Sequence, residues 1–223
     1  MISLNTDLLS DLSCYLFNAL FLSVFLCACY KSPWRLIKSN SRLQHLCFGA
    51  SVALILLWSI KADISSGISI HLIGMTAMSL VLGWDLAIVC ASISLALVTL
   101  ASGSSWSSFA ANGVITILLP VTVTYITAAI VDRKLPKNFF IYLFVCGFFC
   151  AGLCAMLIGL SVSLTLWVND IHPWVTIQRE IMTIIVLTIF PEGLLNGVFL
   201  SAIMAFYPDW IRSFDARAYI DDQ

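Results

Sequence analysis

The chain has 223 residues, of which 61% are hydrophobic and 10% are charged, and its formal net charge at pH 7 is −1. A soluble domain carries about 25% charged residues, so this composition excludes a soluble domain and predicts one polytopic membrane domain over residues 1–223. The small net charge gives no bulk attraction to nucleic acid, which excludes that class of partner.

Apolar runs of about 17 to 20 residues, the length that crosses a membrane, predict seven transmembrane helices. In chain order they cover 11–30, 43–61, 67–83, 85–102, 109–131, 138–168 and 180–207. The third and fourth are short and meet at LGWDLA, where Gly83 and Asp85 predict a tight turn. The first follows an uncharged segment with no cleavage site, so we expect a retained helix and not a signal peptide.

Basic residues predict the orientation of the bundle. With seven spans, Lys61 and Arg179 fall on one side of the membrane, and the other nine Lys and Arg residues fall on the opposite side. The positive-inside rule then places the N-terminus outside and the C-terminus in the cytoplasm. A six-span arrangement would put the loop around Arg133 on the wrong side. We therefore expect an all-α, seven-helix bundle.

Polar side chains in the third and fifth predicted spans are candidates for function, because ionisable groups are costly inside a membrane. His71 stands about five residues, or roughly 7 Å, from the outer end of its span, with Met75 and Met78 predicted on the same helix face. Imidazole suits several first-row metals and thioether suits softer ions, so this face is either a metal site or packing. Asn112, at a similar depth, is either part of that site or a bridge between helices.

The seventh predicted span carries Glu192 directly after Pro191, and Asn196 one turn further on. A carboxylate at this depth must find a partner or stay protonated. It either belongs to a proton path or accepts hydrogen bonds from backbone groups freed at the proline kink. The outer loops contain further polar residues that are either solvated or line an entry vestibule, namely Asp63, Asn169, Asp170 and His172.

Small residues repeat every four positions in the sixth predicted span, at Gly147, Ala151, Ala155 and Gly159. This stripe permits close helix approach, either within the bundle or against a partner membrane subunit. The eight cysteines include no Cys-x-x-Cys pair, so we interpret them as small hydrophobic residues. Neither a Gly-x-Ser-x-Gly elbow nor a His-Glu-x-x-His motif is present, so we expect no catalytic residues, no cofactor and no enzyme activity.

Three segments together resemble the CbiM/NikM family of energy-coupling-factor uptake systems: GISIHLIGMTAMSLVLGWDLAI (67–88), FAANGVITILLPVTVTYI (109–126) and FPEGLLNGVFLSAIMAFYPDWI (190–211). SPWRLI, LQHLCFGA and RKLPKNFFIYLFVCGFF look closer to a proteobacterial branch of predicted permeases of this type. The resemblance implies a substrate-binding component in the bacterial inner membrane that takes up cobalt or nickel. It also implies two kinds of partner, a membrane coupling (T-type) subunit and ATPase subunits.

In the family that the chain resembles, the metal is held by the N-terminal amine, a histidine at position 2 and a histidine that matches His71. An all-nitrogen set suits square-planar Ni(II), or Co(II) in a similar site. Here Ile2 replaces the second histidine, so the resemblance leaves the Met1 amine and His71. A different set would be completed by Asp7, Asn112, His172 or the methionine Met75; otherwise the substrate is not a metal.

Two alternatives stay open at this point. A vitamin or small-molecule uptake component on the same bundle would need a larger outer pocket, lined by aromatic residues such as Trp106, Phe109 and Trp174. A non-transport membrane enzyme or assembly factor would use Glu192 and His71 for catalysis or structure. The expected depths of these two residues differ by about five residues of helical rise, ~7 Å.

Overall fold

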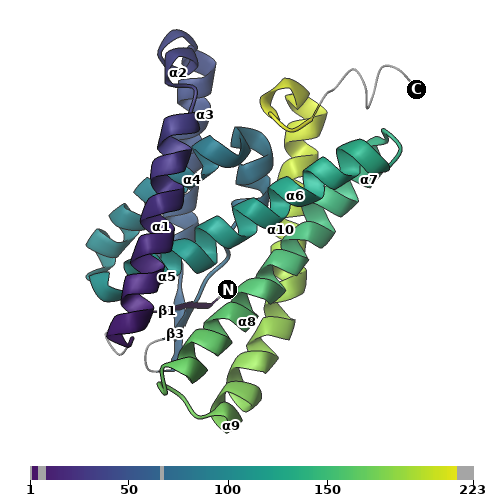
Figure 1. Cartoon of the computed structure of the whole chain (residues 1–223). Helices are drawn as coiled ribbons and strands as arrows, with labels where there is room; N and C mark the ends of the chain where they lie inside the picture. The colour runs from purple at the N-terminus through teal and green to yellow at the C-terminus, as the bar shows by residue number, and fades with distance from the viewer. Residues whose placement is uncertain (1, 5–8, 66–67, 215–223) are drawn as a thin grey trace.

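The computed structural model describes residues 2–4, 9–65 and 68–214 (Figure 1). Within them, six helical segments are long and apolar enough to cross a membrane: Asp11–Lys31, Ser41–Ser59, Met75–Ser102, Trp106–Lys134, Phe139–Val168 and Trp174–Phe206. The chain is therefore a mainly helical, multi-pass membrane protein, as the composition predicts. The count is six and not seven because the third and fourth predicted spans belong to one element.

The individual elements are as follows in chain order. The first half of the chain contains β1 (Ile2–Leu4), α1 (Asp11–Lys31), α2 (Trp34–Ser39), α3 (Ser41–Ser59), β2 (Ala62–Ser65), β3 (Ile68–Ile70) and α4 (Met75–Ser102). The second half contains η1 (Trp106–Ser108), α5 (Phe109–Asn112), η2 (Gly113–Leu118), α6 (Leu119–Lys134), α7 (Phe139–Tyr142), η3 (Leu143–Phe149), α8 (Cys150–Val168), α9 (Trp174–Thr176), η4 (Ile177–Ile181), α10 (Met182–Phe206) and η5 (Pro208–Trp210).

Side-chain caps mark the starts of α1 and α7, which lie close to the predicted starts at residues 11 and 138. The Ser10 hydroxyl accepts a hydrogen bond from the backbone N–H of Ser13 at the start of α1. Asn138 caps α7 in the same way through Phe140. Short polar side chains at this position satisfy N–H groups that the first helical turn leaves without partners.

The prediction of a helix over 67–83 is wrong for residues 68–74, and residue 67 lies outside the described residues. Residues Ile68–Ile70 form strand β3, His71 follows in irregular backbone, and α4 begins only at Met75. The sequence from Ile68 to His71 alternates apolar and polar residues, which is the strand period and not the helical one. Gly74 then adopts a left-handed conformation with φ +67°, which interrupts the backbone before the helix. His71 consequently shares no helix face with Met75 and Met78.

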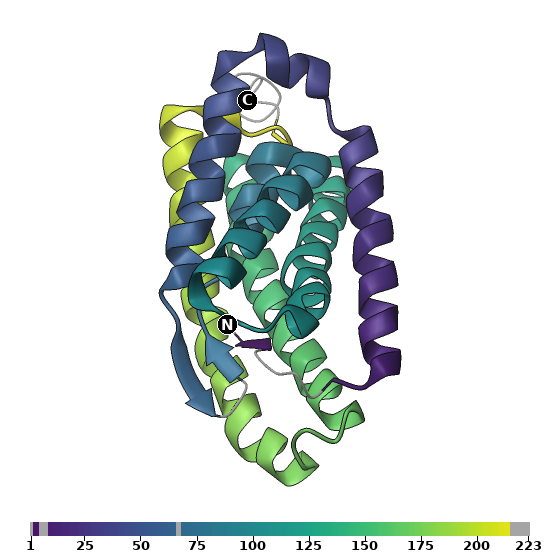
Figure 2. The same cartoon turned by 90° about the vertical axis from the view of Figure 1, so that its left-hand side faces the viewer.

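The short strands form one three-stranded antiparallel sheet with the order β1-β3-β2. Ile2 pairs with Ile70 and Leu4 pairs with Ile68, so the beginning of the chain lies beside the segment that leads to His71. β1 contacts α5 and α8, and the sheet lies in the lower half of the bundle as drawn (Figures 1 and 2). The sheet thus joins residues about 65 positions apart next to the helices.

α4 breaks and reverses direction at Gly83, whose φ of 80° and ψ of 172° are not helical. His71, immediately before α4, and Ser102, at its end, line the same cavity. A straight 28-residue helix would separate its ends by about 42 Å. The predicted turn at LGWDLA therefore coincides with a helical hairpin. Arg212 stabilises the turn by donating to Leu82 O at 3.1 Å and to Asp85 Oδ1 at 2.6 Å.

The small-residue stripe lies at the contact between α8 and α10. A Cβ atom added at Gly147 would lie 2.9 Å from Leu200 Cδ2, and one added at Gly159 would lie 2.4 Å from Ile185 Cγ1. Such short distances show that the helices approach closely because the side chains are absent. The stripe therefore serves packing within the chain.

Candidate functional site

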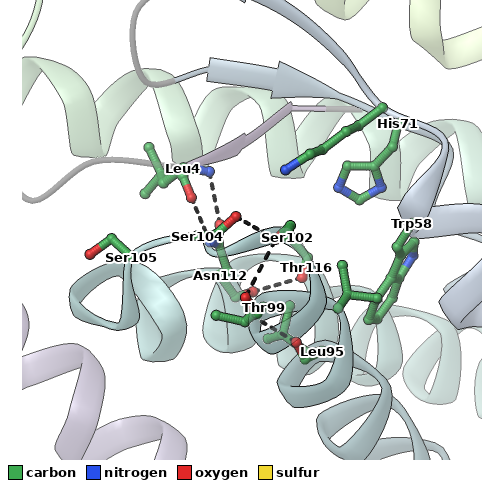
Figure 3. A pocket seen from close by; sticks show the side chains of 12 residues that line it. Leu4, Trp58, His71, Leu95, Thr99, Ser102, Ser104, Ser105, Asn112 and Thr116 are labelled. Atoms are coloured by element: carbon green, nitrogen blue, oxygen red, sulfur yellow. Dashed lines mark hydrogen bonds between the residues drawn. The ribbon is translucent and has the colours of Figure 1, made fainter.

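A cavity of about 50 Å³ lies between the sheet, the end of α4 and the α5–η2 segment (Figure 3). Its lining includes Trp58, Lys61, His71, Asn112 and Thr116. Pockets for drug-sized molecules measure roughly 300 Å³ or more, whereas roughly 15 Å³ admits one water molecule. The cavity is therefore large enough for an ion with a few water molecules and too small for a vitamin.

His71 faces this cavity from the backbone between β3 and α4 (Figure 3). Its Nδ1 lies 3.0 Å from Leu72 O, and because a carbonyl oxygen only accepts, Nδ1 carries the proton and Nε2 the lone pair. Burial lowers the pKa of His71 from 6.5 to about 4. The imidazole is therefore neutral at pH 7, which is the form that ligates metals.

Trp58 binds the backbone that follows His71. Its indole Nε1 donates to Ile73 O at 3.0 Å, and its ring centroid lies 6.2 Å from that of His71. The indole is buried at the end of α3, with 3% of its surface exposed. Trp58 thus fixes the backbone two residues after His71 and limits how far the imidazole can move.

Asn112 pairs with the N-terminal strand and not with a second helix. Its Oδ1 accepts from Leu4 N at 2.8 Å, and its Nδ2 donates to Leu4 O at 2.7 Å (Figure 3). Leu4 is therefore bound on two sides, because it pairs with Ile68 in the sheet and also bonds to the side chain of Asn112. Asn112 therefore holds β1 against the bundle beside the cavity.

The remaining predicted ligands either lie outside the described residues or do not line the cavity beside His71. Met1 and Asp7 lie outside the described residues. Met75 is completely buried at the first position of α4, and His172 lies between α8 and α9; neither lines the cavity. The structure thus brings His71 and Asn112 to one cavity and leaves Met75 and His172 away from its lining.

Glu192 and Asn196 form a second polar group, at the start of α4. Glu192 Oε2 accepts from Ile73 N at 2.9 Å and Oε1 accepts from Gly74 N at 2.8 Å. Asn196 Oδ1 accepts from Ala77 N at 2.9 Å. The carboxylate therefore satisfies the backbone of another helix, and not the groups beside Pro191 that the sequence suggested. Its partners lie about 119 positions away, so no local pattern could identify them.

The aromatic residues expected to line a larger outer pocket, Trp106, Phe109 and Trp174, line neither of two cavities in the described part of the chain. Trp106 and Trp174 are 53% and 47% exposed, and neither lines the cavity beside His71. A larger cavity of about 580 Å³ opens near the break in α4, but its aromatic lining consists of Trp84 and Tyr125. The pocket expected for a vitamin carrier is therefore not formed by the residues that the sequence suggested.

A complete metal-ligand set is not found in the part of the chain that the structure describes. There, no three His, Cys, Asp or Glu side chains come together as a group able to hold a metal ion. His71 is the one such side chain lining the cavity of about 50 Å³ within the described ranges. Further ligands would have to come from backbone groups, from other residue types or from residues outside those ranges.

Comparisons with known proteins identify a family and a fold. The CbiM family model, described as "Cobalt uptake substrate-specific transmembrane region", matches residues 4–210. A solved structure titled "Crystal Structure of an transition metal transporter" has a TM-score of 0.75 and 15% sequence identity, and covers 91% of this chain and 92% of that one. Another, titled "Crystal Structure of an Truncated Transition metal Transporter", has a TM-score of 0.72 and 15% identity, with 93% and 98% covered. No curated protein matches the chain.

Proposed function

Because the chain belongs to the CbiM family, we propose that it is the substrate-binding membrane component of an energy-coupling-factor uptake system for Co(II) or Ni(II). Membership of this family identifies a transporter and not an enzyme. The observation that carries the metal proposal is the imidazole of His71, which faces a cavity of about 50 Å³. A cavity of this size fits an ion and excludes a vitamin-sized substrate.

The proposed ligands are the imidazole of His71 and the amine of Met1. The pairing of Ile2 with Ile70 supports this choice, because it brings the N-terminal strand beside the residue that precedes His71. Asn112 supports the site by holding β1 through Leu4. Asp7 is proposed as a further ligand, because a carboxylate would supply an anionic oxygen to a set otherwise made of nitrogen.

We propose seven membrane crossings, with the N-terminus outside and the C-terminus in the cytoplasm of a bacterial cell. The reversal at Gly83 supports two crossings, one by residues 68–74 together with the first arm of α4 and one by its second arm. Glu192 contacts Ile73 and Arg212 contacts Leu82, so the first arm runs in the same direction as α10. With seven crossings the basic loops fall on one side, as the positive-inside rule requires. Labelling of single cysteines by an impermeant reagent in intact cells tests this orientation.

The proposed partners are a T-type coupling subunit and ATPase subunits, since the sequence carries no nucleotide-binding glycine loop. Lipid covers much of the remaining surface. In α1 and α3 only 11% of the most apolar window is buried inside the chain. Apolar helices with such exposed faces are stable in contact with acyl chains.

The proposed function is tested by metal binding and uptake. Calorimetry at neutral pH with the reconstituted protein is expected to show Co(II) or Ni(II) binding that His71→Ala abolishes. His45→Ala is the matched control, because His45 is an exposed histidine on α3. Cells that hold the protein with its ATPase partners are expected to lose uptake with the same variant. Absence of metal binding by the wild type would refute the proposal.

A further inference from the structure

The start of α4 requires hydrogen-bond acceptors from elsewhere in the chain. The first turn of any helix leaves backbone N–H groups without intrahelical partners. At α4 the capping position is Gly74, which has no side chain to accept them. An unpaired buried N–H is costly, so a second element has to supply the oxygens.

That element is α10, which supplies them through two buried side chains. Glu192 is 3% exposed and Asn196 is fully buried. The two carboxylate oxygens accept from Ile73 N and Gly74 N, and the amide oxygen accepts from Ala77 N, all within 2.9 Å. An ionised carboxylate offers only acceptors, and negative charge is favoured at a helix N-terminus.

Glu192 and Asn196 are also hydrogen-bonded to each other. Asn196 Nδ2 donates to Glu192 Oε1 at 2.9 Å and to the backbone oxygen of Glu192 at 2.8 Å. The amide orientation follows from these bonds, because its oxygen must face the N–H of Ala77. Glu192, Asn196 and the α4 backbone therefore form one connected network, which we call the α10 clamp.

The α10 clamp acts on the backbone that carries His71. Ile73 follows His71 by two residues and is held on both sides: its N–H by Glu192 and its carbonyl oxygen by Trp58. On the other side of His71, Ile70 is paired in the sheet with Ile2 and Ala62. The backbone is therefore held on both sides of His71, by the sheet before it and by the α10 clamp after it.

We infer that Glu192 and Asn196 are positioning residues, which hold the His71 segment in the single conformation that directs the imidazole into the cavity. The effect on metal rests on the proposed function, whereas the effect on the segment does not. Neither residue lines the cavity, so both act through the backbone of Ile73, Gly74 and Ala77.

The test uses Glu192→Gln and Asn196→Ala in the full chain. In Glu192→Gln one acceptor becomes an NH₂ donor, so a buried N–H of Ile73 or Gly74 faces another donor. The matched controls are Glu180→Gln, an exposed glutamate in η4, and Asn18→Ala, an exposed asparagine in α1. All variants are compared at equal folded amounts, so that reduced yield does not imitate reduced binding.

Hydrogen–deuterium exchange of the metal-free protein measures the clamp directly. We expect the peptide covering 68–77 to exchange about tenfold or more faster in both clamp variants and to be unchanged in both controls. Unchanged exchange in Glu192→Gln and Asn196→Ala would overturn the inference. Hydrogen–deuterium exchange tests the α10 clamp even if the wild type binds no metal. Such a lack of binding would refute the proposed function and would leave the clamp unaffected.

Co(II) titration then measures the consequence for the site. We expect the affinity of the clamp variants to fall by about tenfold to a hundredfold. We also expect their visible absorption bands at saturation to shift, because a misplaced imidazole changes the ligand field. A purely structural role would lower the amount of folded protein and leave both the affinity and the bands of that fraction unchanged, which would overturn the role in positioning.

Discussion

Asn112→Ala is the most informative change near the cavity, because it removes a side chain that makes two bonds to one residue. Asn112 accepts from Leu4 N at 2.8 Å and donates to Leu4 O at 2.7 Å. After the substitution the pairing of β1 with β3 and its contacts with α5 and α8 remain. The helix around residue 112 keeps its own backbone bonds, so the effect should be confined to the strand.

The expected magnitude follows from these two bonds. Each contributes about 1 kcal/mol to the free energy that holds β1 in place, so their loss amounts to about 2 kcal/mol. Since 1.4 kcal/mol is tenfold, opening of β1 becomes about 30 times more frequent. If Met1 is a ligand as proposed, the apparent metal affinity falls by up to the same factor, because β1 carries the residues that follow Met1 and pairs beside His71.

Hydrogen–deuterium exchange of the β1 and β3 amides, followed by Ni(II) calorimetry, measures both effects. Asn18→Ala serves as the control, because it removes the same chemical group from an exposed position on α1. If Asn112→Ala exchanged and bound metal like the wild type, β1 would not be part of the site, and the argument from its pairing with Asn112 would be wrong.

Four further outcomes are expected. Gly83→Ala should destabilise the protein by about 1–3 kcal/mol in thermal unfolding, because φ +80° with ψ 172° is a glycine conformation. Gly159→Leu should destabilise it by about 1–3 kcal/mol in the same assay, through its clash with Ile185. Lys61→Gln should strengthen Co(II) binding about two- to tenfold in calorimetry, because an ammonium that lines the cavity repels the ion. Burial lowers the pKa of His71 to about 4, so the stability contributed by the neutral ring is fully present above pH 6.5 and is lost as the pH falls through 4. The free energy of unfolding of the metal-free wild type should therefore fall relative to that of His71→Gln between pH 6.5 and pH 4, and the difference between the two should be constant above pH 6.5.

Long apolar runs made most of the helices predictable from the sequence. The first predicted span, 11–30, differs by one residue from α1, and the sixth, 138–168, differs by one residue from Phe139–Val168. In both cases the apolar length decides the outcome and polar residues such as Ser10 and Asn138 mark the start. The break at Gly83 was also visible, because a glycine between two short apolar runs permits a reversal.

The beginning of the third predicted span shows where a length rule fails. The alternation from Ile68 to His71 indicates a strand, but an apolar run that continues to Leu82 hides it when hydropathy is averaged. The partner strand begins at Ile2, and such pairing is not encoded in local composition. The length rule therefore predicts Met75 and Met78 as neighbours of His71 on one helix face, and the structure does not form that face, because α4 begins only at Met75.

Glu192 and Asn196 show the same limit for the polar residues. A carboxylate and an amide inside a membrane-spanning segment need hydrogen-bond partners, and this need follows from the residue type and its depth. Which backbone groups they bind depends on where α4 starts, and Gly74 determines that about 118 positions away. The sequence could therefore predict that Glu192 and Asn196 have hydrogen-bond partners. It could not predict which groups those partners are.

A transition metal is proposed to bind in the cavity between His71 and the N-terminal strand. Crystals of the protein grown with Co(II) and measured at the cobalt absorption edge would test this by anomalous scattering. We expect one strong peak within bonding distance of His71 Nε2, which disappears in His71→Ala and persists in His45→Ala. A peak elsewhere in the bundle, or a peak unaffected by His71→Ala, would contradict it.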